Sequence, residues 1–373
     1  MVKVFHCADI HLDSPFSLYS PKEAERRRTE LRAAFTSAIM LARELGVQLF
    51  LISGDLFDGE YVTADTKELL LREFRSFPEC RFFISPGNHD PLGARSAYRT
   101  LQLPDNVHVF SERERVSVPE LGVDVYGFGY TSRSYPKSPV TDWHIENPDA
   151  INILVCHGDI YGDASVGPIS KGEIGKSGFD YVALGHIHKG TGLLNENGVY
   201  YGYPGCIEGR SFDETGYKGV LIGTVDKGKC AFKPYRLSKR RYECVTVDIS
   251  GAGEKLTALD IIRKSIRTYC DDTALRITLT GEVTGAFMIL PAEIGKGREY
   301  PYRIDIIDKT TLAPDLGELE KSNTLKGVFC RMMLEKIAQC EKDSEEAAIL
   351  YDALRYGLCA LEDRSISSVV GGE

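Results

Sequence analysis

The sequence predicts an α/β protein whose functional groups lie where β-strands end. The first part of the chain alternates short apolar, β-rich runs with runs of helical periodicity, which is typical of a layered α/β domain. Five of the apolar runs lead directly into short motifs rich in Asp, His and Asn. The chain has 373 residues, 43% of them hydrophobic, which is enough for a sizeable core and for two or three domains.

Three helices are expected in this first part. Residues 22–45 carry apolar side chains at helical spacing, and Gly46 follows as a C-cap. The Arg run at 26–28 near the start of this helix is expected to be a solvated face rather than a phosphate contact. Residues 63–77 predict a second helix, and 94–101 a third, shorter one.

A β-hairpin and a change of pattern follow later in the chain. Residues 217–225 and 230–237 predict two strands joined at Asp226-Lys227-Gly228, and we expect them to complete a second sheet. The polar run 239–241 then predicts a boundary. We therefore assign a first domain to residues 1–240.

The rest of the chain predicts a smaller α+β domain and a helical tail. The domain, residues 241–321, is expected to hold three strands and one helix. The tail, residues 322–373, has two amphipathic helices between 324 and 363, separated by the polar stretch 341–346. The first of them carries an apolar stripe of Phe329, Met332, Met333 and Ile337.

The motifs that carry the chemistry share one layout, in which a strand ends and ligand-type side chains follow. They are Asp9-Ile10-His11 after residues 2–5, Gly54-Asp55-Leu56-Phe57-Asp58 after 49–52, Gly87-Asn88-His89-Asp90 after 82–84, His157-Gly158-Asp159 after 151–155, and Gly185-His186-Ile187-His188 after 181–184. Functional groups in α/β sheets gather at the carboxyl ends of strands, and glycines let the backbone turn sharply there. We therefore expect these side chains to meet in one small volume.

The residue types indicate a metal site. Imidazole, carboxylate and amide oxygen suit divalent Mn, Fe or Zn, and one carboxylate can bridge two ions. Two ions about 3.5–4 Å apart can activate a water and stabilise a leaving oxygen, as phosphate-ester hydrolysis requires. Each motif alone is weak, but five of the eight His of the chain fall inside the set. This concentration favours a functional site over five separate structural roles.

The five motifs, in this order, resemble the calcineurin-like metallophosphoesterases over roughly residues 1–240. The resemblance implies a four-layer α/β/β/α sandwich and two divalent ions, of which Mn is the first candidate and Fe, Zn or Mg are others. It implies that His89 stabilises charge or donates a proton at the phosphate, oriented by Asp58. It implies one ion on Asp9, His11, Asp55 and His188, and the second on Asp55, Asn88, His157 and His186.

Within that superfamily the chain is most similar to DNA repair exonucleases of the SbcD type, and to their YhaO-like branch. The similarity lies in the run from His11 to Phe16, in the motif ending at Asp58, and in the added C-terminal region. It implies a metal-dependent exonuclease or endonuclease acting at DNA ends, with the α+β domain capping the site. It also implies an SbcC-like ABC-type ATPase docked on the C-terminal helices, and a homodimer paired through helices beside the active site.

Two other function classes remain open. A phosphodiesterase for a small ester such as a cyclic nucleotide would use the same ligands, although the long region beyond residue 240 favours a larger substrate. The second is a DNA-binding subunit without catalytic activity. The complete set of seven ligands argues against it, because an inactive site has no need to keep them all. A protein serine/threonine phosphatase is disfavoured, because that group has Glu and Arg where this chain has Asp90 and Gly59.

Net charge and hydropathy bear on whether DNA or a membrane is a partner of the protein. The formal net charge of −9 disfavours a protein that coats the DNA backbone, but bound divalent ions can supply a local positive field. No apolar run is long enough to cross a bilayer, and the first residues lack a small-residue cleavage site. We expect a cytoplasmic protein without a membrane partner.

Overall fold

The computed structural model describes residues 1–284, 287–312, 316–341 and 344–361. Within them the chain forms two compact units. The first unit comprises Met1–Cys244, Tyr269–Arg276 and Gly297–Ile304. The second unit comprises Val245–Thr268, Ile277–Lys296 and the chain from Asp305 on. The predicted borders at residues 240 and 321 stay predictions.

The first sheet of the first unit has the strand order β12-β11-β1-β2-β3-β4. Its strands are β1 (Val2–Cys7), β2 (Leu49–Ile52), β3 (Arg81–Ile84), β4 (Val107–Val109), β11 (Gly219–Asp226) and β12 (Lys229–Arg236). The strands β1 to β4 run parallel, and the hairpin β11–β12 adds antiparallel strands beside β1.

The hairpin lies where the sequence predicts it, but the prediction that it completes a second sheet is wrong. Val225 of β11 pairs with Val2 of β1, in the first sheet. The physical reason is backbone pairing, because β11 hydrogen-bonds along β1 from Val2–Val225 to His6–Leu221 and so covers an edge of β1 that would otherwise be unpaired.

The second sheet has the order β5-β6-β7-β8-β10-β9. Its strands are β5 (Glu114–Val118), β6 (Val123–Gly127), β7 (Ile151–His157), β8 (Tyr181–Gly185), β9 (Leu194–Glu196) and β10 (Val199–Gly202). The four central strands are parallel, and β5 and β9 are antiparallel edges. Strands buried on both faces read as continuous apolar runs, as the fully buried β7 does.

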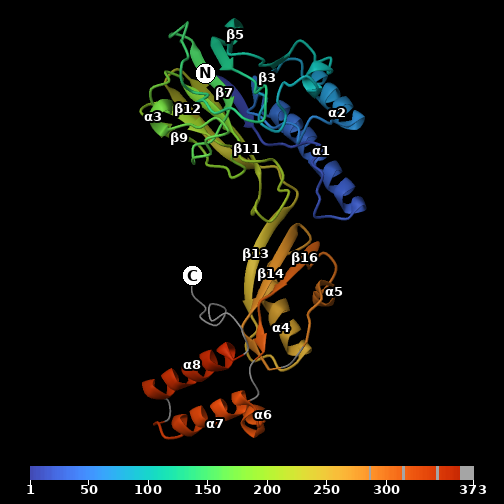
Figure 1. Cartoon of the computed structure of the whole chain (residues 1–373). Helices are drawn as coiled ribbons and strands as arrows, with labels where there is room; N and C mark the ends of the chain where they lie inside the picture. Colours follow the sequence, from blue (N-terminus) through green and yellow to red (C-terminus); the bar gives the residue numbers. More distant parts are fainter. Residues whose placement is uncertain (285–286, 313–315, 342–343, 362–373) are drawn as a thin grey trace. The chain divides into compact units, whose positions relative to one another are not determined.

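The two sheets pack face to face with helices outside them, which confirms the predicted four-layer sandwich. Leu51 and Phe83 of the first sheet share a core with Val125 and Val155 of the second. The helices α1 (Pro21–Glu44) and α2 (Ala64–Arg75) cover the outer face of the first sheet (Figure 1). The outer face of the second is covered mainly by irregular segments and the one-turn helix α3 (Lys171–Ile174).

The helices differ from the sequence expectations in two details. Arg27 of α1 is only 1% exposed and forms ion pairs with Glu30 and Glu208, so the Arg run is not simply a solvated face. The helix expected at 94–101 is a short 3-10 turn, η1 (Ala97–Arg99). Leu69, Leu70 and Phe74 of α2 pack in the core of the first unit, and the homodimer stays a prediction.

The second unit contains most of a three-stranded sheet and a separate helical group. The sheet, of order β13-β14-β16, consists of β13 (Arg241–Asp248), β14 (Thr273–Thr280) and β16 (Arg303–Asp308). Short elements accompany it, namely α4 (Lys255–Ile266), α5 (Pro291–Ile294), β15 (Glu282–Val283) and β17 (Thr311–Leu312). An α+β composition for this region agrees with the sequence expectation.

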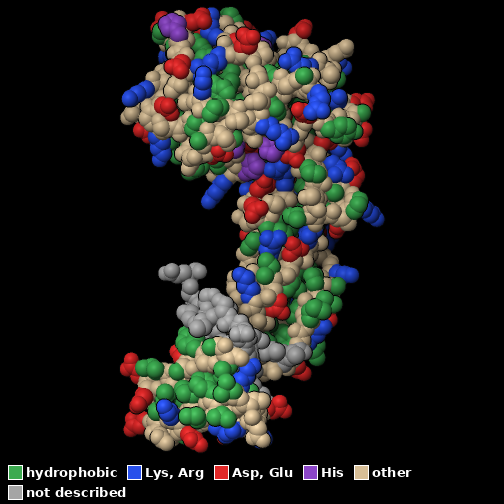
Figure 2. Space-filling model, in the orientation of Figure 1, with side chains coloured by type: hydrophobic (Ala, Val, Ile, Leu, Met, Phe, Trp, Pro, Cys, Tyr) green, Lys and Arg blue, Asp and Glu red, His purple; other side chains and the backbone are tan. Residues whose placement is uncertain are grey.

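The tail helices α6 (Leu316–Lys321), α7 (Leu325–Ile337) and α8 (Glu345–Ala360) have a small core of their own. Phe329, Met333 and Ile337 of the predicted stripe belong to it, whereas Met332 is 57% exposed. Figure 2 shows further hydrophobic side chains on the surface of these helices. Part of the predicted separator, and everything beyond residue 361, lies outside the described residues. None of the described helices is long and apolar enough to span a bilayer.

Candidate metal centre

Five strand ends carry the predicted ligands to one place, and they come from both sheets. β1, β2 and β3 belong to the first sheet, and β7 and β8 to the second. Within each sheet the parallel register aligns the ends, with Cys7 beside Ile52 and His157 beside Gly185. The carboxyl ends of parallel strands therefore present the motifs side by side, and the sheets meet there.

The backbone at these ends is held in an uncommon conformation. The φ angles are 51° at Asp9, 51° at His11, 52° at Asp55 and 105° at His186. Non-glycine residues rarely adopt positive φ, and such strain persists only where surrounding contacts enforce it. Here the N–H of Asp9 donates to the Gly54 carbonyl at 3.1 Å, and that of His11 to the Asp55 carbonyl at 2.9 Å.

Two glycines allow the sheets to approach at the site. A Cβ on Gly185 would lie 1.8 Å from the carbonyl oxygen of Ser53 on the other sheet. A Cβ on Gly54 would lie 2.2 Å from Nδ1 of His157, and Gly54 also has a φ of 90°. The close approach therefore excludes any larger residue at both positions.

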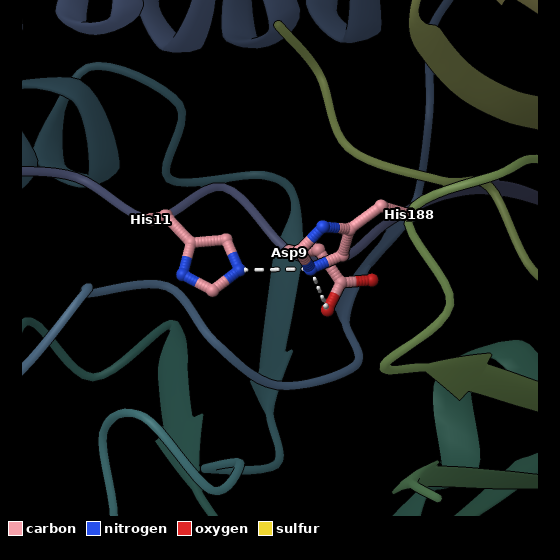
Figure 3. Close-up of side chains that lie close together, drawn as sticks. All are labelled: Asp9, His11 and His188. Carbon is pink, nitrogen blue, oxygen red and sulfur yellow. Dashed lines mark hydrogen bonds and ion pairs between the residues drawn. The ribbon is translucent and has the colours of Figure 1, made fainter. Parts of the chain in front are cut away.

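The first group of ligands is Asp9, His11 and His188 (Figure 3). The Nε2 atoms of His11 and His188 lie 3.2 Å apart, and Nε2 of His188 is 3.8 Å from Oδ1 of Asp9. Oδ2 of Asp55 lies 3.7 Å from Nε2 of His11. Asp9, His11 and Asp55 are buried, so the donor atoms face one another with little access to bulk water.

The second group lies on the other side of Asp55. Nε2 of His157 is 2.9 Å from Oδ1 of Asn88 and 3.5 Å from Oδ2 of Asp55. The ring of His186 lies 5.2 Å from that of His157, and its Nε2 is 3.5 Å from Oδ2 of Asp159. The same Asp55 oxygen thus lies within 4 Å of one histidine of each group, as expected of a bridging ligand.

Three histidines have one ring nitrogen committed to an acceptor. Nδ1 of His11 donates to Oδ1 of Asp58 at 2.8 Å, and Nδ1 of His188 donates to Oε1 of Glu214 at 2.7 Å. Nδ1 of His157 donates to the carbonyl oxygen of Ser53 at 2.9 Å. A carbonyl or carboxylate oxygen can only accept, so the proton belongs on Nδ1. The Nε2 lone pairs are then free, and those of His11 and His188 converge at 3.2 Å, an arrangement that a cation stabilises.

The electrostatics agree with ligands ready to bind a cation. Burial lowers the pKa of His11 and lowers that of His186 to about 4, so both rings are neutral near pH 7. At His188 burial also acts to lower the pKa, but the hydrogen bond to Glu214 and the charge of Asp9 outweigh it and raise the pKa. Burial alone would raise the pKa of Asp58 and Glu214, but the hydrogen bonds with His11 and His188 hold both carboxyl groups below their usual range. Neutral imidazoles beside ionised carboxylates are a suitable donor set for a divalent metal.

Comparison with known proteins agrees with this geometry. Residues 2–190, about half of the chain, match the family model of calcineurin-like phosphoesterases. The chain belongs to that family. All five strand-end motifs lie within the matched residues.

Two curated proteins are similar to this phosphoesterase. The uncharacterized metallophosphoesterase YhaO of Bacillus subtilis is 31% identical over 268 residues, which are 68% of this chain and 64% of that protein. The DNA double-strand break repair protein Mre11 of Saccharolobus solfataricus is 24% identical over 73% of this chain and 70% of its own. Among solved structures, the crystal structure of TT1561 of Thermus thermophilus matches with a TM-score of 0.36 and 12% identity, over 62% of this chain and 98% of that one.

Two residues of the phosphoesterase site were missed by the sequence analysis. Glu214 bonds to His188, and Arg210 donates to Oδ1 of Asp58 at 2.9 Å and to Oε1 of Glu214 at 3.1 Å. Arg210 therefore ties together the two carboxylates that orient His11 and His188. Both residues lie in the loop between β10 and β11, where no apolar strand precedes them, and the only signal is their spacing of four.

Asp90 is a further organising residue. Its carboxylate is buried and accepts from the backbone N–H groups of Leu56, Phe57 and Gly87 and from the hydroxyl of Tyr98. Burial, together with the nearby charge of Asp55, raises its pKa to about 6. Asp90 thus holds the loops after β2 and β3 in register with each other.

His89 occupies a different position from the ligand histidines. Its side chain is 43% exposed, and its Nδ1 lies 3.4 Å from Oδ1 of Asp58. Its backbone N–H donates to Oδ1 of Asp55 at 2.9 Å. The ring thus borders the site and is open to a substrate, while its backbone helps to orient the central carboxylate.

Proposed function

We propose that this phosphoesterase hydrolyses phosphodiester bonds of DNA ends with the help of two divalent ions. The observation that carries the proposal is the position of Asp55, whose Oδ2 lies 3.7 Å from His11 and 3.5 Å from His157. A carboxylate between two histidine groups is suited to a pair of ions. Two such ions supply an activated water and stabilise the leaving oxygen.

The residues divide into two sets. Asp9, His11, Asp55 and His188 would hold one ion, and Asp55, Asn88, His157 and His186 the other. Asp58, Glu214 and the Ser53 carbonyl would keep the ring nitrogens oriented, because each accepts the Nδ1 proton of a ligand. Mn is the ion that we propose first, with Fe, Zn and Mg as alternatives.

His89 would act on the phosphate group itself. It is the exposed histidine of the site, and Asp58 lies close enough to orient its ring. An imidazole there can stabilise negative charge on the phosphate or donate a proton to the leaving oxygen. The other histidines are less exposed, with His11 and His157 buried and the side chains of His186 and His188 21% and 28% exposed.

The choice of DNA rests on similarity as well as on chemistry. One relative is described as a DNA double-strand break repair protein. We propose that this chain likewise acts on DNA ends, that the region of residues 241–321 caps the site, and that the tail helices dock an ABC-type coiled-coil ATPase. A homodimer of the first unit is a further proposal.

The test offers purified protein three substrates in parallel, with Mn²⁺ and with a chelator. The substrates are end-labelled linear DNA, covalently closed circular DNA and a cyclic nucleotide. We expect metal-dependent release of nucleotides from linear DNA and little from the other two. Hydrolysis of the cyclic nucleotide alone would identify a small-ester phosphodiesterase, and no hydrolysis of any of them would support a non-catalytic binding role.

A further inference from the structure

A groove next to the metal centre has no role in the proposed chemistry. It lies in the first unit, has a volume of about 640 Å³, and is lined by the loop after β8, by the loop between β10 and β11, and by β11 and β12. Its lining begins at Lys189, the residue directly after the ligand His188. Figure 2 shows Lys and Arg side chains close to the histidines on this unit. The groove therefore begins where a substrate strand would leave the site.

The charged side chains that line the groove are all cationic. They are Lys189, Lys218 and Arg236, and its lining includes no Asp or Glu. Arg236 lies 3.7 Å from Asp272, outside the lining, so the two lysines carry the positive charge of the groove. The chain as a whole has a net charge of −9, so a lining without carboxylates departs from its average surface. Such a groove favours an anionic occupant.

Lys218 gives the strongest indication of a bound anion. The residue is only 8% exposed, and its Nζ donates to the carbonyl oxygen of His188 at 3.3 Å. Among the described residues no carboxylate lies within ion-pair distance of it. A buried ammonium has three protons to donate and is costly to leave without a counter-charge. A phosphate in the groove would supply both the acceptors and the charge.

Two tyrosines supply an aromatic surface. The guanidinium of Arg236 lies 3.3 Å from the ring centre of Tyr217, whose hydroxyl donates to Asp272 at 2.6 Å, so this ring is held in place. Tyr235 is 37% exposed and has neither a ring contact nor a hydrogen bond to other described residues. Exposed aromatic rings in a cationic groove are typical of sites that bind single-stranded nucleic acid by stacking its bases.

We propose that this groove binds a single-stranded segment of the DNA substrate, with a phosphate on Lys218 and Lys189 and a base on Tyr235. The proposal rests on the function proposed above and adds a subsite to it. A duplex presents its bases stacked and paired, so their faces are not available to Tyr235. The groove thereby favours substrates whose ends are single-stranded or can be opened.

The test measures binding of a fluorescent single-stranded oligonucleotide to the full-length, chelator-treated protein by anisotropy, so no hydrolysis interferes. We expect Tyr235→Ala to weaken binding about 5- to 100-fold, the range for loss of one stacked base. Lys189→Glu should weaken binding and lower the salt dependence by about 0.7 in log–log slope. The matched control is Lys233→Glu, an exposed lysine on β12 that is not part of the groove lining, and it should bind much like the parent.

Further arms distinguish the outcomes. An oligonucleotide carrying a photoreactive base should crosslink to the peptide that contains Tyr235, and a duplex of the same sequence should bind more weakly. Unchanged binding by both groove variants, with the fold verified by thermal unfolding, would overturn the proposal. If the parent protein hydrolyses linear DNA in that case, the proposed function survives alone. Equal competition by inorganic phosphate would reduce the groove to a small-anion site and also overturn the proposal.

Discussion

At the scale of single residues, the site depends on carboxylates that are buried and surrounded by imidazoles. Asp55 is 1% exposed, and its Oδ2 faces the Nε2 atoms of His11 and His157. The hydrogen bond from His89 N–H engages the other oxygen. Burial by itself would raise the pKa of Asp55, but the facing histidines hold it below its usual value, so the group is ionised at neutral pH.

The first prediction concerns Asp55→Asn. The substitution keeps the shape but removes the negative charge shared by both groups of ligands. We expect both ions to be lost or weakened, with a larger loss of activity than in His188→Asn, which changes one group only. Metal content by mass spectrometry and hydrolysis of bis(p-nitrophenyl) phosphate measure the two effects. Asp226→Asn, whose side chain is 54% exposed, is the control. Two ions and full activity in Asp55→Asn would refute the bridging role.

The second prediction concerns His89→Ala. Because the side chain is 43% exposed and no ligand set needs it, we expect both ions to remain. Turnover should fall by about 10²- to 10⁴-fold, which is typical for loss of a group that transfers a proton. Metal content and kcat are measured together. Loss of an ion with the side chain would reveal His89 as a ligand instead.

Sequence alone predicted the ligands better than their supporting residues. The seven predicted ligands and His89 follow apolar strands, so topology gathers them, and the structure does bring these side chains together, while their role as ligands stays a prediction. Glu214 and Arg210 lie in a loop whose path depends on tertiary packing, and the Ser53 acceptor is a backbone carbonyl that any residue could provide. No local pattern identifies partners of this kind.

At the scale of secondary-structure elements, the site requires two sheets to meet at their strand ends. The third prediction is that Gly54→Ala damages both fold and metal binding. Its Cβ would lie 2.2 Å from Nδ1 of His157, and the φ of 90° is strained for alanine. We expect a destabilisation of at least about 1–3 kcal/mol, measured by urea unfolding. Gly59→Ala is the control, because nothing lies within 4 Å of its added Cβ. Wild-type stability and metal content in Gly54→Ala would contradict the geometry.

The fourth prediction concerns an ion-pair network that joins α1 to two other segments. Glu208 lies in the loop between β10 and β11, and Arg240 directly precedes β13. Glu30 accepts from Arg27 at 2.6 Å and from Arg240 at 2.7 Å. Burial raises the pKa of Glu30, but the hydrogen bonds and charges of the two arginines outweigh it and lower the pKa to about 2. Burial has the larger effect at Glu208, whose pKa is raised, so we attribute the acid dependence to Glu30.

We expect Glu30→Gln to lower the free energy of unfolding at pH 7 by about 3 kcal/mol, because it removes the carboxylate that pairs with buried Arg240 and leaves Arg27 with Glu208 alone. The folded-state pKa is lowered, so the stabilisation is present above the unfolded-state pKa of about 4.5 and is lost as the pH falls toward 2. Urea unfolding at several pH values should therefore show the parent and the variant converging in acid. Glu25→Gln, on the same helix but 58% exposed, should cost less than about 1 kcal/mol. A pH-independent difference for Glu30→Gln would contradict the assignment.

The sequence predicted where helices and strands lie more closely than it predicted which strands pair with each other. α1 begins at a Ser20 capping box with Pro21 at its first turn, and its periodicity is visible in the sequence. The choice of partner for β11 depends instead on which strand edge is available for pairing, and that edge belongs to β1, more than 200 positions away in the sequence. Arg27 was misjudged for the same reason, because its partner Glu208 is distant in the sequence.

At the scale of the whole molecule, the tail helices have a hydrophobic core of their own. This core of Cys330, Ile337, Leu354 and Leu358 includes residues from the tail helices alone. The outer face of α7 leaves Leu325 70%, Val328 42% and Met332 57% exposed. These residues recur at the spacing of one helix face, so they replace the predicted stripe as the surface that we propose for the ATPase.

The fifth prediction is that a chain ending at Leu312 keeps its metal centre but loses its partner. Truncation there removes all three tail helices together, so no apolar residue of their shared core is left exposed on the remaining chain. We expect normal metal content and hydrolysis of bis(p-nitrophenyl) phosphate, with no co-purification of a coiled-coil ATPase from the native host. The full-length double variant Val328→Lys with Met332→Lys should lose the same partner without losing the tail. An insoluble truncated chain would show that the helices stabilise the rest of the fold. Retention of the ATPase by both variants would place its binding site elsewhere on the chain, because the truncation removes every tail helix and the double variant alters only their exposed apolar face.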